Sequence, residues 1–141
     1  MNNRSIERKF EEIVHGEQAH FSVIITEKMV NEFGRLSGDM NPLHMNTSYA
    51  LHTPFKQRVV HGMLGGALIS RLVGMYLPGK YALYLKQTLN FHKPMFVGME
   101  VFITGVVVAK TDATRTLEIE TVVKNNADIL ISGRALVQVT R

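Results

Sequence analysis

The sequence predicts an α+β fold, in which an antiparallel sheet covers one long apolar helix. Three observations lead to this prediction. Apolar residues recur at helical spacing in the first half of the chain, the segment 59–77 is apolar on most faces, and from residue 81 onward apolar and polar residues alternate. A helix that is apolar nearly all round has to be buried, and a meander of strands can provide its cover.

Short elements are expected before the long apolar segment. Apolar spacing predicts a turn or helix over residues 6–14, and the β-branched run 20–25 predicts a strand. Thr26 can cap a helix that ends near Gly38. A further short helix is expected to begin at residue 46 or 47.

The segment 59–77 is long enough to suggest a membrane span, and its small residues at 62 and 66 fit the spacing of paired membrane helices. However, Arg71 lies well inside it, several glycines weaken it, and Pro78-Gly79 ends it. We therefore expect a helix over about 62–76 that is buried in the protein core, and no membrane association.

Strands are expected over residues 81–93, 99–110, 115–124 and 129–140, joined by short polar turns that suit antiparallel hairpins. The strand near residue 20 would join the edge of this sheet. In the first of the four, alternation puts five apolar side chains on one face and polar ones on the other. The apolar set is Tyr81, Leu83, Leu85, Leu89 and Phe91.

Composition limits the classes of function. The 141 residues show no repeat or linker, which predicts one domain over residues 1–141. The absence of cysteine excludes thiolate catalysis and a disulfide framework, and the N-terminal segment has no apolar stretch typical of a signal peptide, so a cytoplasmic protein is expected. The net charge is +4, but Lys and Arg are scattered, which argues against nucleic-acid binding and fits a phosphate-bearing ligand such as coenzyme A.

One segment carries the residues of a chemical site. Asp39, Asn41 and His44 lie within six residues of one another, on a turn fixed by Gly38 and Pro42. On a turn that folds back at Asn41, the carboxylate and the imidazole can converge on one water molecule and act as a general acid–base pair.

Each of these residues also has a structural explanation. Asp39 could form a turn or cap a helix, Asn41 is a common residue before proline, and His44 could be half-buried and bonded to a carbonyl. Asp39, His44 and His61 could also bind a metal, but no paired histidine spacing accompanies them, so no metal site is expected.

The run Ser37-Gly38-Asp39-x-Asn41-Pro42-Leu43-His44, with Phe33 before it and Ala50 after it, resembles the hydratase-2 motif of the MaoC-like (R)-specific enoyl-CoA hydratases. The later runs 60–63, 77–79 and 91–98 are similar to that family in order and spacing. The resemblance covers roughly residues 20–140.

This resemblance implies a hot-dog fold, in which the antiparallel sheet wraps around the central helix. It implies that Asp39 and His44 are a catalytic dyad that adds water to a trans-2-enoyl thioester, giving the (R)-3-hydroxyacyl product. The N–H of Gly62 would stabilise the negative charge that builds on the thioester oxygen, as suits the unpaired N–H groups at a helix start. Asn41 would orient the dyad or its water, and Ser70 would line the pocket.

The implied substrate is an acyl-CoA or acyl-carrier-protein thioester, with coenzyme A as part of the substrate and no separate cofactor. A small sheet around one helix leaves edges to cover, so a homodimer or a dimer of dimers is expected. Two alternatives remain open, a hot-dog thioesterase and a non-catalytic module that binds acyl thioesters.

Overall fold

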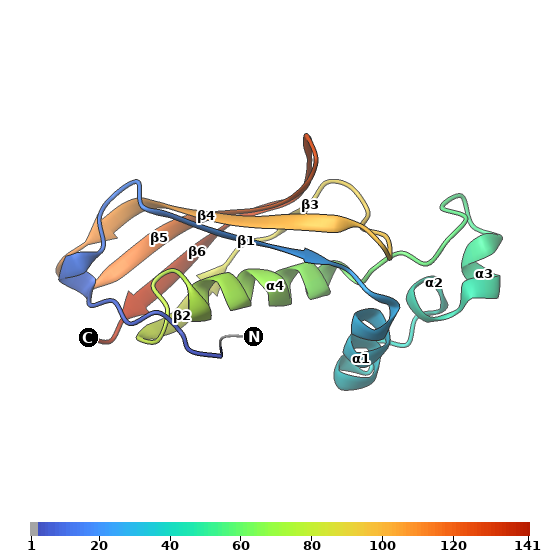
Figure 1. Cartoon of the computed structure of the whole chain (residues 1–141), viewed down its shortest axis with the longest axis horizontal. Helices are drawn as coiled ribbons and strands as arrows, with labels where there is room; N and C mark the ends of the chain where they lie inside the picture. Colours follow the sequence, from blue (N-terminus) through green and yellow to red (C-terminus); the bar gives the residue numbers. More distant parts are fainter. Residues whose placement is uncertain (1–2) are drawn as a thin grey trace.

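A curved antiparallel sheet covers one side of helix α4 (Gly62–Met75) in the computed structural model, which describes residues 3–141 (Figure 1). The sheet has six strands in the order β1-β4-β5-β6-β2, and β3 pairs with β6. Their bounds are β1 (Gln18–Ile24), β2 (Ala82–Gln87), β3 (Asn90–Phe91), β4 (Glu100–Thr111), β5 (Thr116–Asn125) and β6 (Asp128–Val139). All pairings are antiparallel, so the α+β prediction is confirmed.

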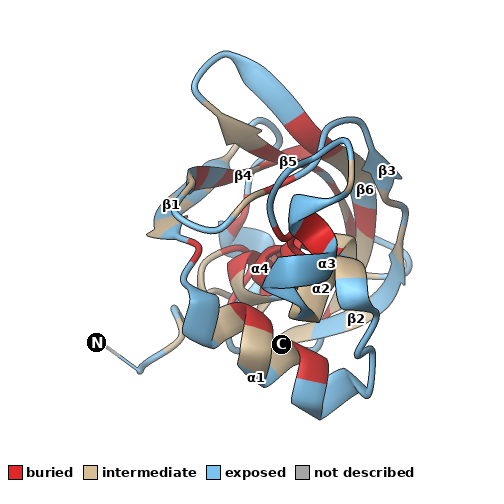
Figure 2. Cartoon of the chain, turned by 90° about the vertical axis from the view of Figure 1, so that its right-hand side faces the viewer, coloured by how far each residue is buried: buried red, intermediate tan, exposed pale blue. Residues whose placement is uncertain are grey.

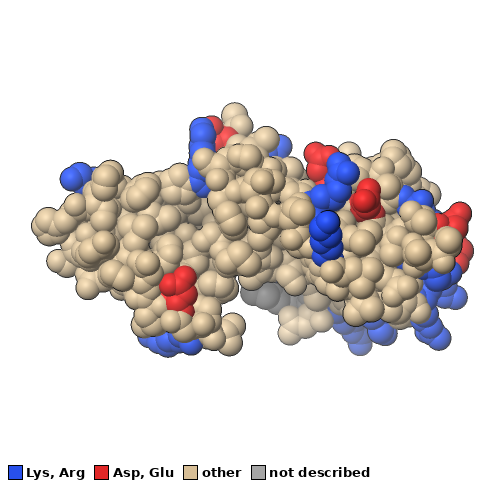
Figure 3. Space-filling view, turned by 180° about the vertical axis from the view of Figure 1, so that it is seen from behind, with Lys and Arg blue, Asp and Glu red and all other residues tan. Residues whose placement is uncertain are grey.

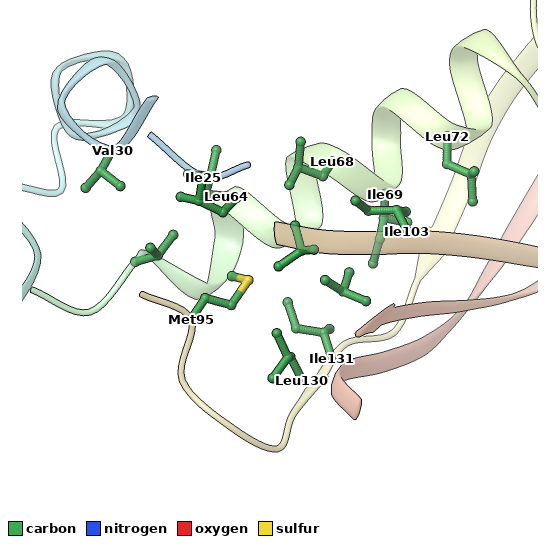
Figure 4. Close-up of a cluster of buried hydrophobic side chains, with 13 residues drawn as sticks. Ile25, Val30, Leu64, Leu68, Ile69, Leu72, Met95, Ile103, Leu130 and Ile131 are labelled. Atoms are coloured by element: carbon green, nitrogen blue, oxygen red, sulfur yellow. The ribbon is translucent and has the colours of Figure 1, made fainter. Parts of the chain in front are cut away.

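The long apolar segment forms the buried helix that its composition predicts. Leu64, Leu68 and Leu72 of α4 are buried, and they belong to one cluster with Ile103 and Ile131 of the sheet (Figure 4). At about 1.5 Å per residue, the 14 residues of α4 extend about 21 Å, well short of a bilayer core of roughly 30 Å. Among residues 3–141, no helix is long and apolar enough to cross a membrane.

A second cluster of buried side chains packs between the C-terminal end of α4, the N-terminal segment and the sheet. It joins Val73 and Leu77 to Phe10 and Ile13 of the N-terminal segment. Of the turn or helix predicted over 6–14, the structure has a 3-10 turn, Phe10–Glu12. Phe10 and Ile13 are buried there, while Ile6 and Val14 are exposed.

Three short helices lie beyond the other end of α4 (Figure 1). Helix α1 (Glu27–Ser37) begins at Thr26, whose hydroxyl accepts a hydrogen bond from Met29 N at 3.2 Å, and ends at Gly38. Helices α2 (Pro42–Met45) and α3 (Thr47–Leu51) follow directly. Asn46 caps α3, so the predicted starts of both α1 and α3 are confirmed.

The five apolar residues predicted to share one face of residues 81–93 do not share one environment. The chain forms two strands there, and Leu83, Leu85 and Phe91 are about half exposed, whereas Tyr81 and Leu89 pack against the buried clusters. Tyr84, on the opposite face of β2, packs against the second buried cluster. Alternation reveals that a strand has two faces, but it does not decide which one the core covers when both carry apolar residues.

Candidate active site

The side chains of Asp39, His44 and His61 meet at the N-terminal end of α4. One oxygen or nitrogen atom from each lies within 4.8 Å of the others. Asp39 follows α1, His44 lies on α2, and His61 is the N-cap residue of α4. The turn at residues 38–42 therefore brings the predicted acid and imidazole together.

The backbone around Asp39 is fixed by local hydrogen bonds. Gly38 ends α1 with φ +79°, a conformation that L side chains rarely adopt, and its N–H donates to Gly34 O at 2.9 Å. Asp39 N donates to Ser37 Oγ at 3.1 Å, and the Asp39 carboxylate accepts from Asn41 N at 3.2 Å. Asp39 is thus held in an exposed turn where solvent reaches its carboxylate.

Asn41 acts on the site through the helix that follows it. Its side-chain oxygen accepts a hydrogen bond from Leu43 N at 3.0 Å and caps α2, with Pro42 as the first helical residue. This is the turn role that the sequence left open for Asn41. The contact orients α2, and α2 carries His44.

His44 has one ring nitrogen bound and one free for chemistry. Its Nδ1 lies 2.7 Å from the carbonyl oxygen of Val59. A carbonyl can only accept, so Nδ1 carries the proton, and in the neutral ring Nε2 has a lone pair. The bond to a carbonyl that the sequence allowed as a structural explanation is present, and it leaves His44 in the tautomer that a general base at Nε2 requires.

His61 contacts both candidate residues, and the sequence, which grouped these three residues only as a possible metal set, did not show these contacts. It is 2% exposed, and its Nε2 donates to the backbone oxygen of Asp39 at 2.9 Å. Its ring centroid lies 4.1 Å from that of His44, with the ring planes tilted by 31°, and 5.0 Å from that of Phe33. Within the described residues, the Nδ1 of His61 is buried without a hydrogen-bond partner.

A pocket of about 480 Å³ opens beside His44 and Gly62. Its walls are mainly apolar and include Met63, Phe91 and Ile131. Gly62 is the first residue of α4, so its N–H has no carbonyl partner within the helix. A Cβ added to Gly62 would lie 2.8 Å from the Phe91 ring, so only glycine fits there without a shift.

Ser70 does not join this site. It is exposed on α4, and at ~1.5 Å per residue it lies about 12 Å further along the helix than Gly62. The residues that line the pocket do not include it. Within one chain, the structure brings Asp39, His44 and Gly62 to one end of α4 and leaves Ser70 outside.

An acid beside two imidazoles could hold a metal ion by residue type alone. His44 Nδ1 and His61 Nε2 donate to backbone carbonyls, which leaves the Asp39 carboxylate, His44 Nε2 and the buried His61 Nδ1 as the possible ligands. The absence of a metal stays a prediction from the sequence.

The comparison with protein families decides where this fold and site belong. The family model described as "MaoC like domain" matches residues 9–128. The chain belongs to the MaoC-like family. Its relatives include the (R)-specific enoyl-CoA hydratases of Rhodospirillum rubrum, 36% identical over 92% of this chain and 90% of that protein, and of Aeromonas caviae, 39% identical over 87% and 92%.

Known structures of the MaoC-like family show the same architecture. The structure titled as an (R)-hydratase from A. caviae involved in PHA biosynthesis has a TM-score of 0.88 and 35% identity, covering 92% of this chain and 98% of that one. An R-hydratase from Pseudomonas aeruginosa has a TM-score of 0.89 and 35% identity over 93% and 84%. The implied hot-dog fold is confirmed. A shorter match, 32% over 55% of this chain and 46% of that protein, is a mitochondrial 3-hydroxyacyl-[acyl-carrier-protein] dehydratase of Arabidopsis thaliana.

Proposed function

We propose that this MaoC-like protein is an (R)-specific enoyl-CoA hydratase, adding water to trans-2-enoyl-CoA and, in reverse, dehydrating (R)-3-hydroxyacyl-CoA. The observation that carries the proposal is the meeting of the Asp39 carboxylate with the His44 imidazole, which lines a largely apolar pocket. The relatives named as (R)-specific enoyl-CoA hydratases support the choice of reaction.

In the proposed reaction, a water molecule lies between the Asp39 carboxylate and His44 Nε2. One of the two groups accepts a proton from the water as its oxygen bonds to C3 of the substrate. The π electrons of the C2–C3 bond shift toward the thioester, which gives an enolate, and one of the two groups then returns a proton to C2. The net change is addition of one water across the double bond.

The enolate oxygen needs a donor that is in place before the reaction. The Gly62 N–H is suited to this because it lies at a helix start, where N–H groups have no partner within the helix, and because Gly62 lines the pocket. The Phe91 ring lies next to Gly62. Fixed donors of this kind lower a barrier by about 3–4 kcal/mol.

The test is the disappearance of the enoyl-thioester absorbance of crotonyl-CoA, with chiral analysis of the 3-hydroxybutyryl product. Hydration to the (R) product without thiol release is the expected result. Release of free coenzyme A instead would identify a thioesterase, and binding without turnover would identify a non-catalytic module. Assays on enoyl thioesters of the acyl carrier protein would show whether that carrier also serves.

We also propose that the protein needs no metal or other cofactor and works as a homodimer or a dimer of dimers. The α4 face with Met63, Ala67 and Ser70 and the β2 face with Leu83 and Leu85 are exposed in the single chain and need a cover. A monomeric mass in solution would exclude the dimer, and loss of hydration in EDTA would exclude metal-free catalysis. The cytoplasmic location stays a prediction.

A further inference from the structure

Arg58 carries a buried charge that the proposed reaction does not use. Its side chain is 8% exposed, and each of the three guanidinium nitrogens has a hydrogen-bond partner. Nε donates to the backbone oxygen of His44, Nη1 to Glu27 at 3.1 Å and Nη2 to Asn31 at 2.6 Å, with Met45 Sδ at 4.0 Å. Because burying a charge is unfavourable unless it is paired, so complete a set of partners indicates a specific role.

Helix α2 cannot hold its own geometry. It has four residues and none is buried, whereas an isolated helix of one turn is unstable in water. The last carbonyls of any helix lack partners within it, and His44 O is one of these. Arg58 Nε provides the partner.

The residue next to Arg58 binds the same helix at two further points. Val59 N donates to Leu43 O at 3.2 Å, and Val59 O accepts from His44 Nδ1 at 2.7 Å. Residues 58 and 59 therefore hold His44 by its backbone and by its ring. If the backbone of His44 moved, the ring could not keep its bond to Val59 O.

We propose that Arg58 is a positioning residue for His44. Anchored on Glu27 and Asn31 of α1, its guanidinium fixes the His44 carbonyl and so keeps the imidazole in the Nδ1–H tautomer with Nε2 free. The kinetic part of this proposal rests on the proposed function, because it takes His44 as the acid–base group.

Arginine suits this position better than lysine. The planar guanidinium donates in three directions at once, to a backbone carbonyl, an amide and a carboxylate, whereas an ammonium group is a compact point charge. Arg58→Lys is therefore expected to recover only part of the activity that Arg58→Ala loses.

The kinetic test compares Arg58→Ala with Arg115→Ala. Arg115 also pairs with a glutamate, Glu11, at 2.7 Å, but its partner is in the N-terminal segment at the far end of the sheet. Misplacing a catalytic group by about 1 Å can lower a rate by ~100-fold. We expect kcat of Arg58→Ala to fall by about 10–100-fold with KM changed less than about threefold, while Arg115→Ala keeps kcat.

Added guanidinium should restore part of the kcat of Arg58→Ala, while sodium chloride at equal ionic strength should not. A kcat for Arg58→Ala within about twofold of the wild-type value would overturn the proposal, since ~0.4 kcal/mol is too little for a displaced acid–base group.

A second readout does not depend on activity. Nitrogen NMR of histidine-labelled protein reports the tautomer of each ring, and His44→Gln assigns the His44 signals. We expect wild-type His44 to be in the Nδ1–H form and the Arg58→Ala variant to show a mixture of tautomers. An unchanged tautomer in Arg58→Ala would refute the positioning role, even if the wild-type protein had no hydratase activity and the proposed function had failed.

If Arg58→Ala does not fold, Asn31→Ala takes its place in both experiments. It removes one anchor of the guanidinium without leaving a buried charge wholly unpaired, because Glu27 remains. We expect Asn31→Ala to lower kcat and to give a mixture of His44 tautomers, both to a smaller extent than Arg58→Ala. A wild-type kcat and an unchanged His44 tautomer in Asn31→Ala would contradict the positioning role of Arg58.

Discussion

The helix–sheet body of the protein and the loop that carries Asp39 and His44 are stabilised by different interactions. In the body, apolar side chains of α4 and the strands pack in two buried clusters. In the loop, α2 has no buried residue (Figure 2). Residues 58 and 59 hold it by hydrogen bonds, and its Met45 side chain packs against the first cluster. Stability and reactivity are therefore located in largely separate parts of this chain.

The chemistry explains why the loop is built in this way. Asp39 and His44 have to be reached by water and substrate, so they cannot be buried by the hydrophobic effect. Directional bonds to carbonyl oxygens hold them in place without covering them, namely His44 Nδ1 to Val59 O and His61 Nε2 to Asp39 O. The supporting groups His61 and Arg58 are buried.

The distribution of charged side chains also fits a body that is stabilised by its apolar clusters. On the face shown in Figure 3, basic and acidic side chains are interspersed over the surface rather than gathered in one stripe. Several of them form exposed ion pairs, such as Lys80–Glu7 and Lys93–Asp128. Exposed pairs of this kind contribute little to stability, about 0–1 kcal/mol each, so the apolar clusters remain the main support of the body.

The largest expected effect is on activity alone. Asp39→Asn and His44→Ala should each lower the kcat of hydration by about 10²–10⁴-fold, because each removes a group that moves a proton. Neither side chain is buried, so the free energy of unfolding should change by less than about 1.5 kcal/mol. Steady-state kinetics and urea unfolding of each variant test this, and full activity in either one would remove that residue from the proposed dyad.

In the body, a substitution is expected to lower stability and to leave activity unchanged. Ile103 of β4 is fully buried against α4, and Ile103→Ala should lower the free energy of unfolding by about 2–5 kcal/mol through lost contacts and a cavity. Its kcat, measured well below the melting temperature, should stay close to the wild-type value. The matched control is Phe102→Ala on the same strand, where the ring is 40% exposed and the expected loss is below about 1 kcal/mol. Equal losses in the two variants would contradict the assignment of the core face.

The parts of the molecule that could be predicted from sequence are those fixed by neighbours in the chain. Thr26 caps α1, Gly38 ends it in a left-handed conformation, and Asn41-Pro42 starts α2. These interactions span only a few residues, so residue types and spacing indicate them. The convergence of Asp39 and His44 followed from the same local turn.

The parts that could not be predicted depend on contacts between distant segments. His61 and Arg58 lie far from Asp39 and His44 in sequence, and nothing in their local spacing shows that they bind those residues. The exposure of residues 81–93 could not be predicted for a similar reason, because only the pairing of β2 and β3 with β6 fixes their orientation. Ser70 was expected at the pocket only through resemblance, and the single chain leaves it exposed.

Gly62 lies where the two regions meet, and replacing it tests their separation. In Gly62→Ala the new Cβ would be 2.8 Å from the Phe91 ring, so the ring or the helix start must move. We expect kcat/KM to fall about tenfold, because the unpaired N–H at the helix start would be displaced. Gly74→Ala on the same helix, where a Cβ meets nothing within 4 Å, should keep kcat/KM and stabilise the fold by up to about 1 kcal/mol.

The double variant Gly62→Ala/Phe91→Ala shows whether the ring is the cause. Removing the ring leaves room for the new methyl group, so the double variant should be more active than the product of the two single effects predicts. Effects that simply multiply would mean that the ring does not transmit the change at Gly62.

The smallest expected effect is a change of stability at high pH that arises in the body. Burial raises the pKa of Tyr84 to about 12, because the phenolate would lose its hydration. In the unfolded chain the pKa is about 10, so the folded state holds this proton more tightly. The resulting stabilisation is complete below pH ~10 and is lost as the pH rises toward 12. Tyr84→Phe should flatten this part of the stability profile and remove the last component of the tyrosinate absorbance titration. A late component that persists in Tyr84→Phe would contradict the assignment of the raised pKa to this half-buried phenol.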